Sequence, residues 1–187
     1  MNCADKLLIW IKQRHEGQLI RRTAEPYINH LTAVAELASV IPLGYEIGLC
    51  HDLFEETETT GADLRSALIG CGYTDQEADL ILNSTVELTD VFTKKNYPEL
   101  KKKVRKAKEA MRLTTISSAA QTVKYADLIY NIGWVVRYDT KHAGKYLLKK
   151  RLLLLAMTMG EPNLHFKAMS LIEDSLYKIT TTDFTGT

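Results

Sequence analysis

The sequence has few cysteines and no long apolar run. Its three cysteines are odd in number and form no CxxC pair, which argues against a disulfide framework and a structural zinc site. The longest apolar run, residues 152–157, is far too short to cross a bilayer. The first residues lack a long apolar core followed by a small-residue cleavage site, so no signal peptide is expected. We therefore expect a protein of the reducing cytoplasm that has no membrane partner.

The chain also has no excess of charge of one sign. Its 24 Lys+Arg and 23 Asp+Glu leave a formal net charge of +1, so any affinity for anions must come from local patches. Hydrophobic residues make up 45% and charged residues 25%, as in a folded globular protein. Since no repeat, low-complexity segment or Pro/Gly-rich linker divides the chain, we predict one domain over residues 1–179 and a frayed tail over 180–187.

Apolar residues recur at helical spacing along nearly the whole chain. Strict alternation is absent, and the pattern predicts an all-α fold, a bundle of about 8–10 helices. Capping-box spacing after Thr60 and Thr74 predicts two of the helix starts. The expected helices lie near residues 7–11, 31–38, 47–56, 61–70, 75–89, 97–112, 118–134, 142–159 and 162–178.

The segment from His51 to Glu56 concentrates ionisable side chains in an otherwise apolar helix. His51 and Glu55 are four residues apart and share a helix face, as do Asp52 and Glu56. Neighbouring His and Asp side chains can flank one metal ion, and glutamates one turn further on can reach a water or a substrate. The alternative is a polar stripe on a solvated helix.

Two further polar residues extend this pattern. His30 begins a helix, where an isolated histidine is usually a cap or a core residue. Asp127 lies in a strongly apolar helix, where its carboxylate needs either a metal ion or a buried Lys or Arg partner. With His51 and Asp52 these residues form a set of two histidines and two carboxylates. Such mixed N/O donors suit Mn²⁺, Fe²⁺ or Zn²⁺, and open positions on the ion would allow hydrolysis.

Three spaced motifs resemble those of the HD superfamily of metal-dependent phosphohydrolases, in particular the alarmone ((p)ppGpp) hydrolases. The motifs are the stretch 15–30, which ends in PYINH, HDLFEET at 51–57, and VKYADLIYN at 123–131. The resemblance covers about residues 5–160. It implies an all-α HD domain that removes the 3′-pyrophosphate of (p)ppGpp, the nucleotide of the stringent response. The products would be GDP or GTP and pyrophosphate.

The resemblance also implies a role for each matched residue. It implies one Mn²⁺ ion bound by His30, His51, Asp52 and Asp127. Glu55 and Glu56 would be the acidic pair that positions and activates water. Arg21 and Arg22 would be the basic pair beside the guanine and ribose, and Asn131 a polar group on the substrate side.

The sequence departs from the family pattern at a few positions. Glu56 stands where the family has Asp, which moves the carboxylate out by one methylene group. Leu31 replaces a Pro, and Tyr125 and Ile129 replace other common residues. Two alternatives therefore stay open. One is an HD phosphatase that acts on another 2′- or 3′-phosphorylated nucleotide or dinucleotide cofactor, and the other is a non-catalytic nucleotide-binding or antitoxin-like module.

The segment 94–112 is strongly basic and is opposed only by Glu99 and Glu109. Most of it reads as a solvated face. Members that line the mouth of a site would hold a nucleotide with several phosphates, and Lys101 and Arg105 are the candidates for this contact. Aromatic residues do not alternate with the basic ones, so a nucleic-acid partner is not indicated. The expected partner is a small nucleotide substrate.

Overall fold

The computed structural model describes residues 1–185, with side chains to residue 181, and over this range it contains ten helices and no strand. The helices are α1 (Cys3–Arg14), α2 (Ile28–Ala38), α3 (Gly44–Cys50), α4 (Leu53–Glu56), α5 (Gly61–Cys71), α6 (Asp75–Leu88), α7 (Lys102–Leu113), α8 (Ser118–Tyr138), α9 (Thr140–Ala156) and α10 (Pro162–Thr185). The predicted all-α bundle is confirmed. None of the helices in this range has the length and apolarity needed to cross a bilayer.

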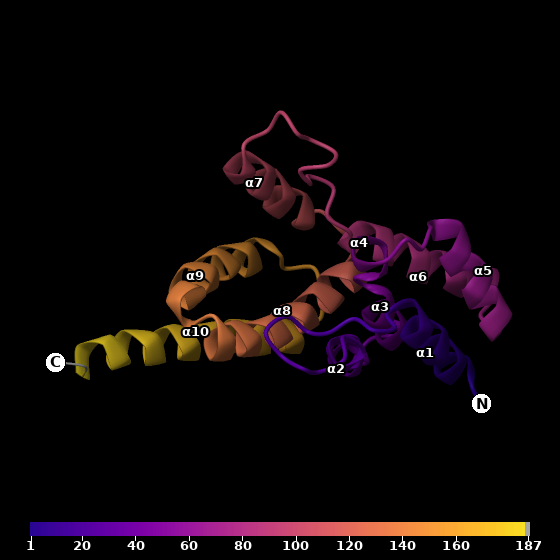
Figure 1. Ribbon diagram of the computed structural model, residues 1–187, viewed down its shortest axis with the longest axis horizontal. Helices are drawn as coiled ribbons and strands as arrows, with labels where there is room; N and C mark the ends of the chain where they lie inside the picture. Colours follow the sequence, from indigo (N-terminus) through magenta and orange to yellow (C-terminus); the bar gives the residue numbers. More distant parts are fainter. Residues whose placement is uncertain (186–187) are drawn as a thin grey trace.

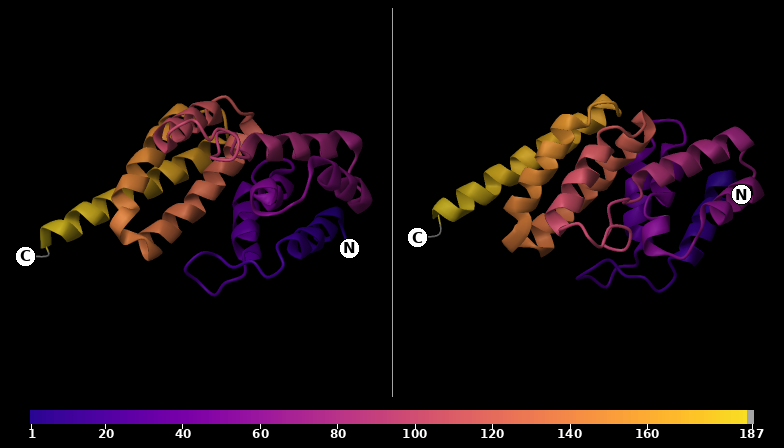
Figure 2. Two further views of the ribbon diagram at one scale, coloured as in Figure 1. Left: turned by 45° about the horizontal axis from the view of Figure 1, so that its top comes forward. Right: turned by 90° about the horizontal axis from the view of Figure 1, so that it is seen from above.

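Helix α8 is the central element of the molecule. It packs against α2, α3, α6, α9 and α10. In Figure 1 it runs through the middle, with α1, α3, α5 and α6 on one side and α9 and α10 on the other. The loop between α1 and α2 reaches across to α8 (Figure 2), where Trp134 Nε1 donates to the Arg21 carbonyl at 3.0 Å. Polar residues near the middle of α8 therefore lie between distant parts of the chain.

The prediction of one continuous helix over 47–56 is wrong, because the chain breaks into α3 and α4 at His51 and Asp52. Asp52 has φ −102° and ψ 3°, outside the helical region. On an unbroken helix, neighbouring side chains diverge by about 100° around the axis. The break instead lets the His51 ring and the Asp52 carboxylate converge, with Nε2 and Oδ2 3.1 Å apart.

Most other helix boundaries follow their local signals. The capping boxes at Thr60 and Thr74 are both present, which confirms the two predicted helix starts. Helix α7 begins at Lys102 rather than near 97, because residues 97–100 form a separate turn in which the Leu100 N–H donates to the Tyr97 carbonyl. Helix α10 continues to Thr185 instead of ending near 178. The domain boundary and the frayed tail over 180–187 stay predictions, and residues 186 and 187 lie outside the described residues.

Helices α2 and α3 lie against each other at very short range. A Cβ atom added at Gly48 would lie 2.6 Å from the Cα of Ala35, well inside contact distance. Only a residue without a side chain fits at this crossing. The close approach brings the first turn of α2, with His30, next to the end of α3, with His51.

Candidate active site

Two histidines and an aspartate meet where α2, the end of α3 and the middle of α8 come together. The side chains of His30, His51 and Asp127 are buried, and one donor atom of each lies within 4.8 Å of the others. The two Nε2 atoms are 3.2 Å apart. Oδ1 of Asp127 lies 3.7 Å from Nε2 of His30 and 3.8 Å from that of His51. The structure thus brings together residues that are far apart in the sequence.

Asp52 approaches the same two ring nitrogens. Its Oδ2 lies 3.1 Å from Nε2 of His51 and 3.4 Å from Nε2 of His30. One ion about 2.1 Å from each donor would hold neighbouring donors about 3.0–3.4 Å apart. The donor separations around His30 and His51 are close to this range. His30, His51 and Asp127 therefore fit a divalent cation, and Asp52 lies against the same two ring nitrogens.

The hydrogen bonds of the two histidines agree with this fit. Nδ1 of His51 lies 2.8 Å from the Gly48 carbonyl and must donate to it, so in the neutral ring Nε2 is the nitrogen whose lone pair can bind a metal ion at the cluster. Nδ1 of His30 is buried and has no partner among the described residues. Burial lowers the pKa of His51, but the Asp52 charge and hydrogen bond outweigh it and raise that pKa to about 9. The carboxylates thus attract positive charge to this point.

The two carboxylates are held from outside the cluster. The Tyr27 hydroxyl donates to Oδ2 of Asp52 at 2.6 Å, and the His15 ring stacks on Tyr27 with centroids 5.5 Å apart. Lys124 Nζ donates to Oδ2 of Asp127 at 2.8 Å, and the Asn131 amide donates to its Oδ1. Burial raises the pKa of Asp127, but Lys124 and His51 lower it below its usual range. Oδ2 of Asp127 is therefore paired with Lys124, while its Oδ1 faces the two histidines of the candidate metal site.

A cavity of about 370 Å³ opens above the cluster. Its cationic lining residues are Arg21, Lys106, Lys124 and Lys150. Its acidic lining residues are Asp52, Glu55, Asp90 and Asp127. Its aromatic lining residues are Tyr27, Tyr130, Trp134 and Tyr146. The arrangement combines a centre for one cation, positive side chains suited to phosphate groups, and rings suited to a base.

The predicted arginine and glutamate pairs are each divided by the structure. Arg21 lines the cavity, whereas Arg22 has a left-handed φ of 62° and turns away to Asp139, 3.2 Å from its carboxylate. Both glutamates are exposed, but only Glu55 lines the cavity, and Glu56 lies outside the lining. One member of each pair is therefore placed to meet a substrate.

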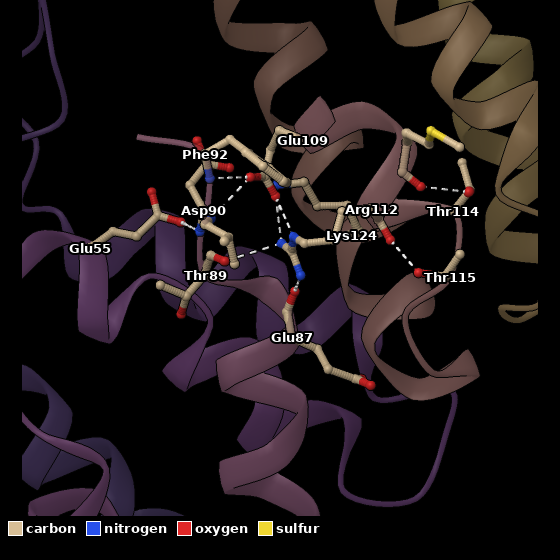
Figure 3. Close-up of polar contacts among 12 residues, drawn as sticks. Glu55, Glu87, Thr89, Asp90, Phe92, Glu109, Arg112, Thr114, Thr115 and Lys124 are labelled. Carbon is tan, nitrogen blue, oxygen red and sulfur yellow. Dashed lines mark hydrogen bonds and ion pairs between the residues drawn. The ribbon is translucent and has the colours of Figure 1, made fainter. Parts of the chain in front are cut away.

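Glu55 is held by the loop that follows α6 (Figure 3). The backbone N–H of Asp90 donates to Oε1 of Glu55 at 2.7 Å. The buried Glu109 carboxylate accepts from the next two backbone N–H groups of that loop, at 2.9 and 2.8 Å. Arg112 bonds to Glu109, to the Glu87 carbonyl in the last turn of α6 and to the Thr89 carbonyl at the start of the loop, so the loop is fixed on α7. Burial raises the pKa of Glu55, which makes its carboxylate a better proton acceptor.

The structure places Lys101 and Arg105, the two predicted contacts from the basic segment, outside the cavity. Lys101 is exposed at the start of α7, and Arg105 folds back to donate to the carbonyls of Leu100 and Tyr97. The next residue, Lys106, lines the cavity instead and lies 2.9 Å from Oδ2 of Asp90. The choice between adjacent residues depends on how α7 is rotated, which composition does not reveal.

Sequence reasoning missed Lys150 of α9. It lines the cavity, and its Nζ lies 5.4 Å from the centroid of the Tyr146 ring. Burial, and then the nearby Lys124 charge, lower its pKa to about 8. The four-residue spacing from Tyr146 to Lys150 was the available signal, since it puts both on one helix face. That spacing does not show which face of the lysine-rich helix α9 meets the site.

The comparisons with known proteins support the fold. No family model matches the chain, and no curated protein matches it. A solved structure of a metazoan ortholog of SpoT, which hydrolyzes ppGpp and plays a role in starvation responses, superposes with a TM-score of 0.75. The match covers 93% of this chain and 96% of that chain, at 18% sequence identity. The predicted resemblance to this class of protein is confirmed at the level of the fold.

Proposed function

We propose that this chain is a metal-dependent hydrolase that removes the 3′-pyrophosphate of (p)ppGpp. The observation that carries the proposal is the convergence of His30, His51, Asp52 and Asp127 at the base of a cavity lined with cations. The likeness in fold to a hydrolase of ppGpp supports the choice of substrate. The mixed imidazole and carboxylate donors suit Mn²⁺, Fe²⁺ or Zn²⁺, and we propose Mn²⁺ because the motifs resemble those of the alarmone hydrolases.

A divalent ion bound to these residues would polarise a phosphate oxygen and ease the deprotonation of water. We propose Glu55 as the group that accepts the proton of the attacking water, because it faces the cavity and burial raises its pKa. The water oxygen forms a bond to the phosphorus attached at the 3′ position. The bond between that phosphorus and the 3′ oxygen breaks, and the 3′ oxygen takes up a proton. The products are GDP or GTP and pyrophosphate.

The remaining cavity residues would bind the nucleotide. Arg21 and Asn131 line the cavity and are the proposed contacts to the nucleoside, with Tyr130 and Trp134 as rings beside the base. Arg22 pairs with an aspartate, so we propose that it fixes the loop that carries Arg21. The predicted roles of Glu56, Lys101 and Arg105 require substrate to reach beyond this cavity.

The test is turnover of ppGpp by protein that has been stripped of metal and reloaded with Mn²⁺. Products are separated by ion-exchange chromatography, and Asp52→Ala is the control. GDP and pyrophosphate from the wild type alone support the proposal. Orthophosphate in place of pyrophosphate, or turnover of other 2′- or 3′-phosphorylated nucleotides only, supports the alternative phosphatase. Absence of both turnover and bound metal supports a non-catalytic binding module.

A further inference from the structure

Three lysines from three helices line the cavity, two of them close enough for their charges to act on the third, and we call the three the lysine wall. Lys106 comes from α7, Lys124 from α8 and Lys150 from α9. Lys106 is 2.9 Å from Asp90, and Lys124 is 2.8 Å from Asp127. Lys150 has no hydrogen bond or ion pair to any of the described residues, although it is half-buried. One ammonium group of this wall therefore has no direct anionic partner among the described residues.

A half-buried ammonium without an anionic partner is costly for a folded protein. The charges of Lys124 and Lys106 act against that of Lys150, and those of Asp127 and Asp90 offset this repulsion in part, so that with burial the net effect lowers the Lys150 pKa. The aromatic ring of Tyr146, 5.4 Å away, offers only a weak compensating contact. An anion bound beside Lys150 would compensate its positive charge, so the lysines form a site suited to an anion.

The position of these lysines relative to the metal centre limits which phosphate group of a nucleotide could bind beside Lys150. Lys124 bonds to Oδ2 of Asp127, and the other oxygen of that carboxylate faces the two histidines. Lys124 is thus separated from the metal centre by a single side chain, and the charges of both Lys124 and Asp127 act on Lys150. A phosphate attached directly to the reacting phosphorus, through one bridging oxygen, would lie beside the centre at this point. A phosphate on the far side of the nucleoside would not.

We propose that Lys150, with Lys106 and Lys124, forms a subsite for the terminal phosphate of a pyrophosphoryl group. The subsite selects esters of pyrophosphate over esters of a single phosphate. This inference rests on the proposed function and deepens it, because it assigns the choice between pyrophosphate and orthophosphate release to named residues. Lys150 is a specificity-determining residue in this assignment.

The first experiment measures equilibrium binding of inorganic pyrophosphate and of orthophosphate to the manganese-loaded protein by calorimetry. Lys150→Met is expected to weaken pyrophosphate binding by about 10- to 100-fold, as for a lost charge-assisted hydrogen bond. Orthophosphate binding should change far less. Lys150→Arg should retain the preference, and Lys149→Met, exposed at the next position of α9, should match the wild type. Equal losses for both anions, or none, would overturn the subsite.

The second experiment compares turnover of ppGpp with that of guanosine 5′-diphosphate 3′-monophosphate. The wild type should favour ppGpp, and Lys150→Met should lose that preference mainly through KM, since it removes binding and leaves the base and the metal ligands in place. A Lys150→Met variant that keeps the wild-type preference contradicts the inference alone. A wild type that hydrolyses neither compound contradicts the proposed function, while the binding experiment still decides the subsite.

Discussion

At the scale of single residues, the ligand cluster depends on groups that hold the ligands. Tyr27 shows this most directly, since its hydroxyl donates to Oδ2 of Asp52, the same oxygen that faces the two histidines. Partners of this kind set the orientation of a metal ligand and commonly change affinity by about 10- to 100-fold. The ring of Tyr27 also supports His15 by stacking, and a phenylalanine would preserve that contact.

Tyr27→Phe should therefore weaken Mn²⁺ binding by about 10-fold, without loss of folding, because it removes one hydrogen bond and keeps the ring. Calorimetric titration of the stripped protein with Mn²⁺ measures the affinity, and circular dichroism monitors the fold. Tyr45→Phe is a matched control, since Tyr45 lies on α3 away from the cavity lining. Wild-type affinity in Tyr27→Phe would show that the hydroxyl does not support the ligand.

The two neighbouring glutamates should differ in their effect on the reaction. Glu55→Gln should lower kcat by about 100- to 10,000-fold, the usual contribution of a general base. Glu56→Gln should lower it by less than about 10-fold, because the Glu56 side chain lies outside the cavity lining. Steady-state kinetics with ppGpp separates the two variants. The reverse order of effects would assign the proton transfer to Glu56.

The sequence motifs predicted the clustered histidines and aspartates but not the lysines that line the cavity beside them. His30, His51, Asp52 and Asp127 occur in recognisable order, and the structure brings them together. Lys150 belongs to no motif, and the role proposed for it rests on its place in the cavity lining without an anionic partner among the described residues. A lack of neutralisation is a property of three-dimensional packing, which periodicity and spacing do not encode.

At the scale of the elements, the crossing of α2 and α3 sets the distance between the two histidines. Gly48→Ala would place a methyl group 2.6 Å from the Cα of Ala35, which is backbone and cannot rotate away. We expect a loss of about 1–3 kcal/mol in the free energy of unfolding, as for other overpacked contacts. Mn²⁺ affinity should fall as well, since α3 must shift and His51 moves with it.

Chemical denaturation and Mn²⁺ titration of Gly48→Ala test this expectation. Gly144→Ala is the control, because a methyl group there meets nothing within 4 Å in the interior of α9. Loss of an unneeded helical glycine should stabilise that variant by about 0.5–1 kcal/mol. Equal stability of Gly48→Ala and the wild type would mean that the crossing adjusts without cost.

Helix starts were more predictable than helix breaks. Thr60 and Thr74 set their helix starts through their own side chains, so a local pattern sufficed. The break at His51 and Asp52 could not be predicted from a glycine or proline, because neither residue type occurs at these positions or next to them. It is fixed by contacts such as that of Tyr27 with Asp52, which join residues distant in the sequence.

At the scale of the whole molecule, the uncompensated lysine should reduce stability in a pH-dependent way. The pKa of Lys150 in the folded protein is about 8, below the value of about 10.4 expected in the unfolded chain. The unfolded chain therefore binds more protons between these two pH values, and the wild type gains stability as pH rises through that window. The charged groups that act on Lys150 are Lys124, Asp127, Lys106 and Asp90.

Lys150→Met should accordingly have a higher Tm than the wild type at pH 7, by a few degrees. The difference should shrink as pH rises from about 8 towards 10.4, because the wild-type lysine becomes neutral in both states. Thermal unfolding across this range measures it, with Lys149→Met as the variant in which no such trend is expected. A constant difference at all pH values would mean that it comes from added apolar contact instead of removed charge.

The proposed metal ligands also come from parts of the chain that are far apart in the sequence. Cys3, Cys50 and Cys71 are all free, so no covalent bridge constrains the unfolded protein. An ion held jointly by His30 of α2 and Asp127 of α8 would close a loop of roughly 100 residues, which the chain-entropy model for a covalent cross-link values at about 4–5 kcal/mol. The proposed ion would then also act as a cross-link that stabilises the folded state. Chelation should act on this protein as reduction acts on a disulfide-bonded one, releasing α8 and the first third of the chain from each other.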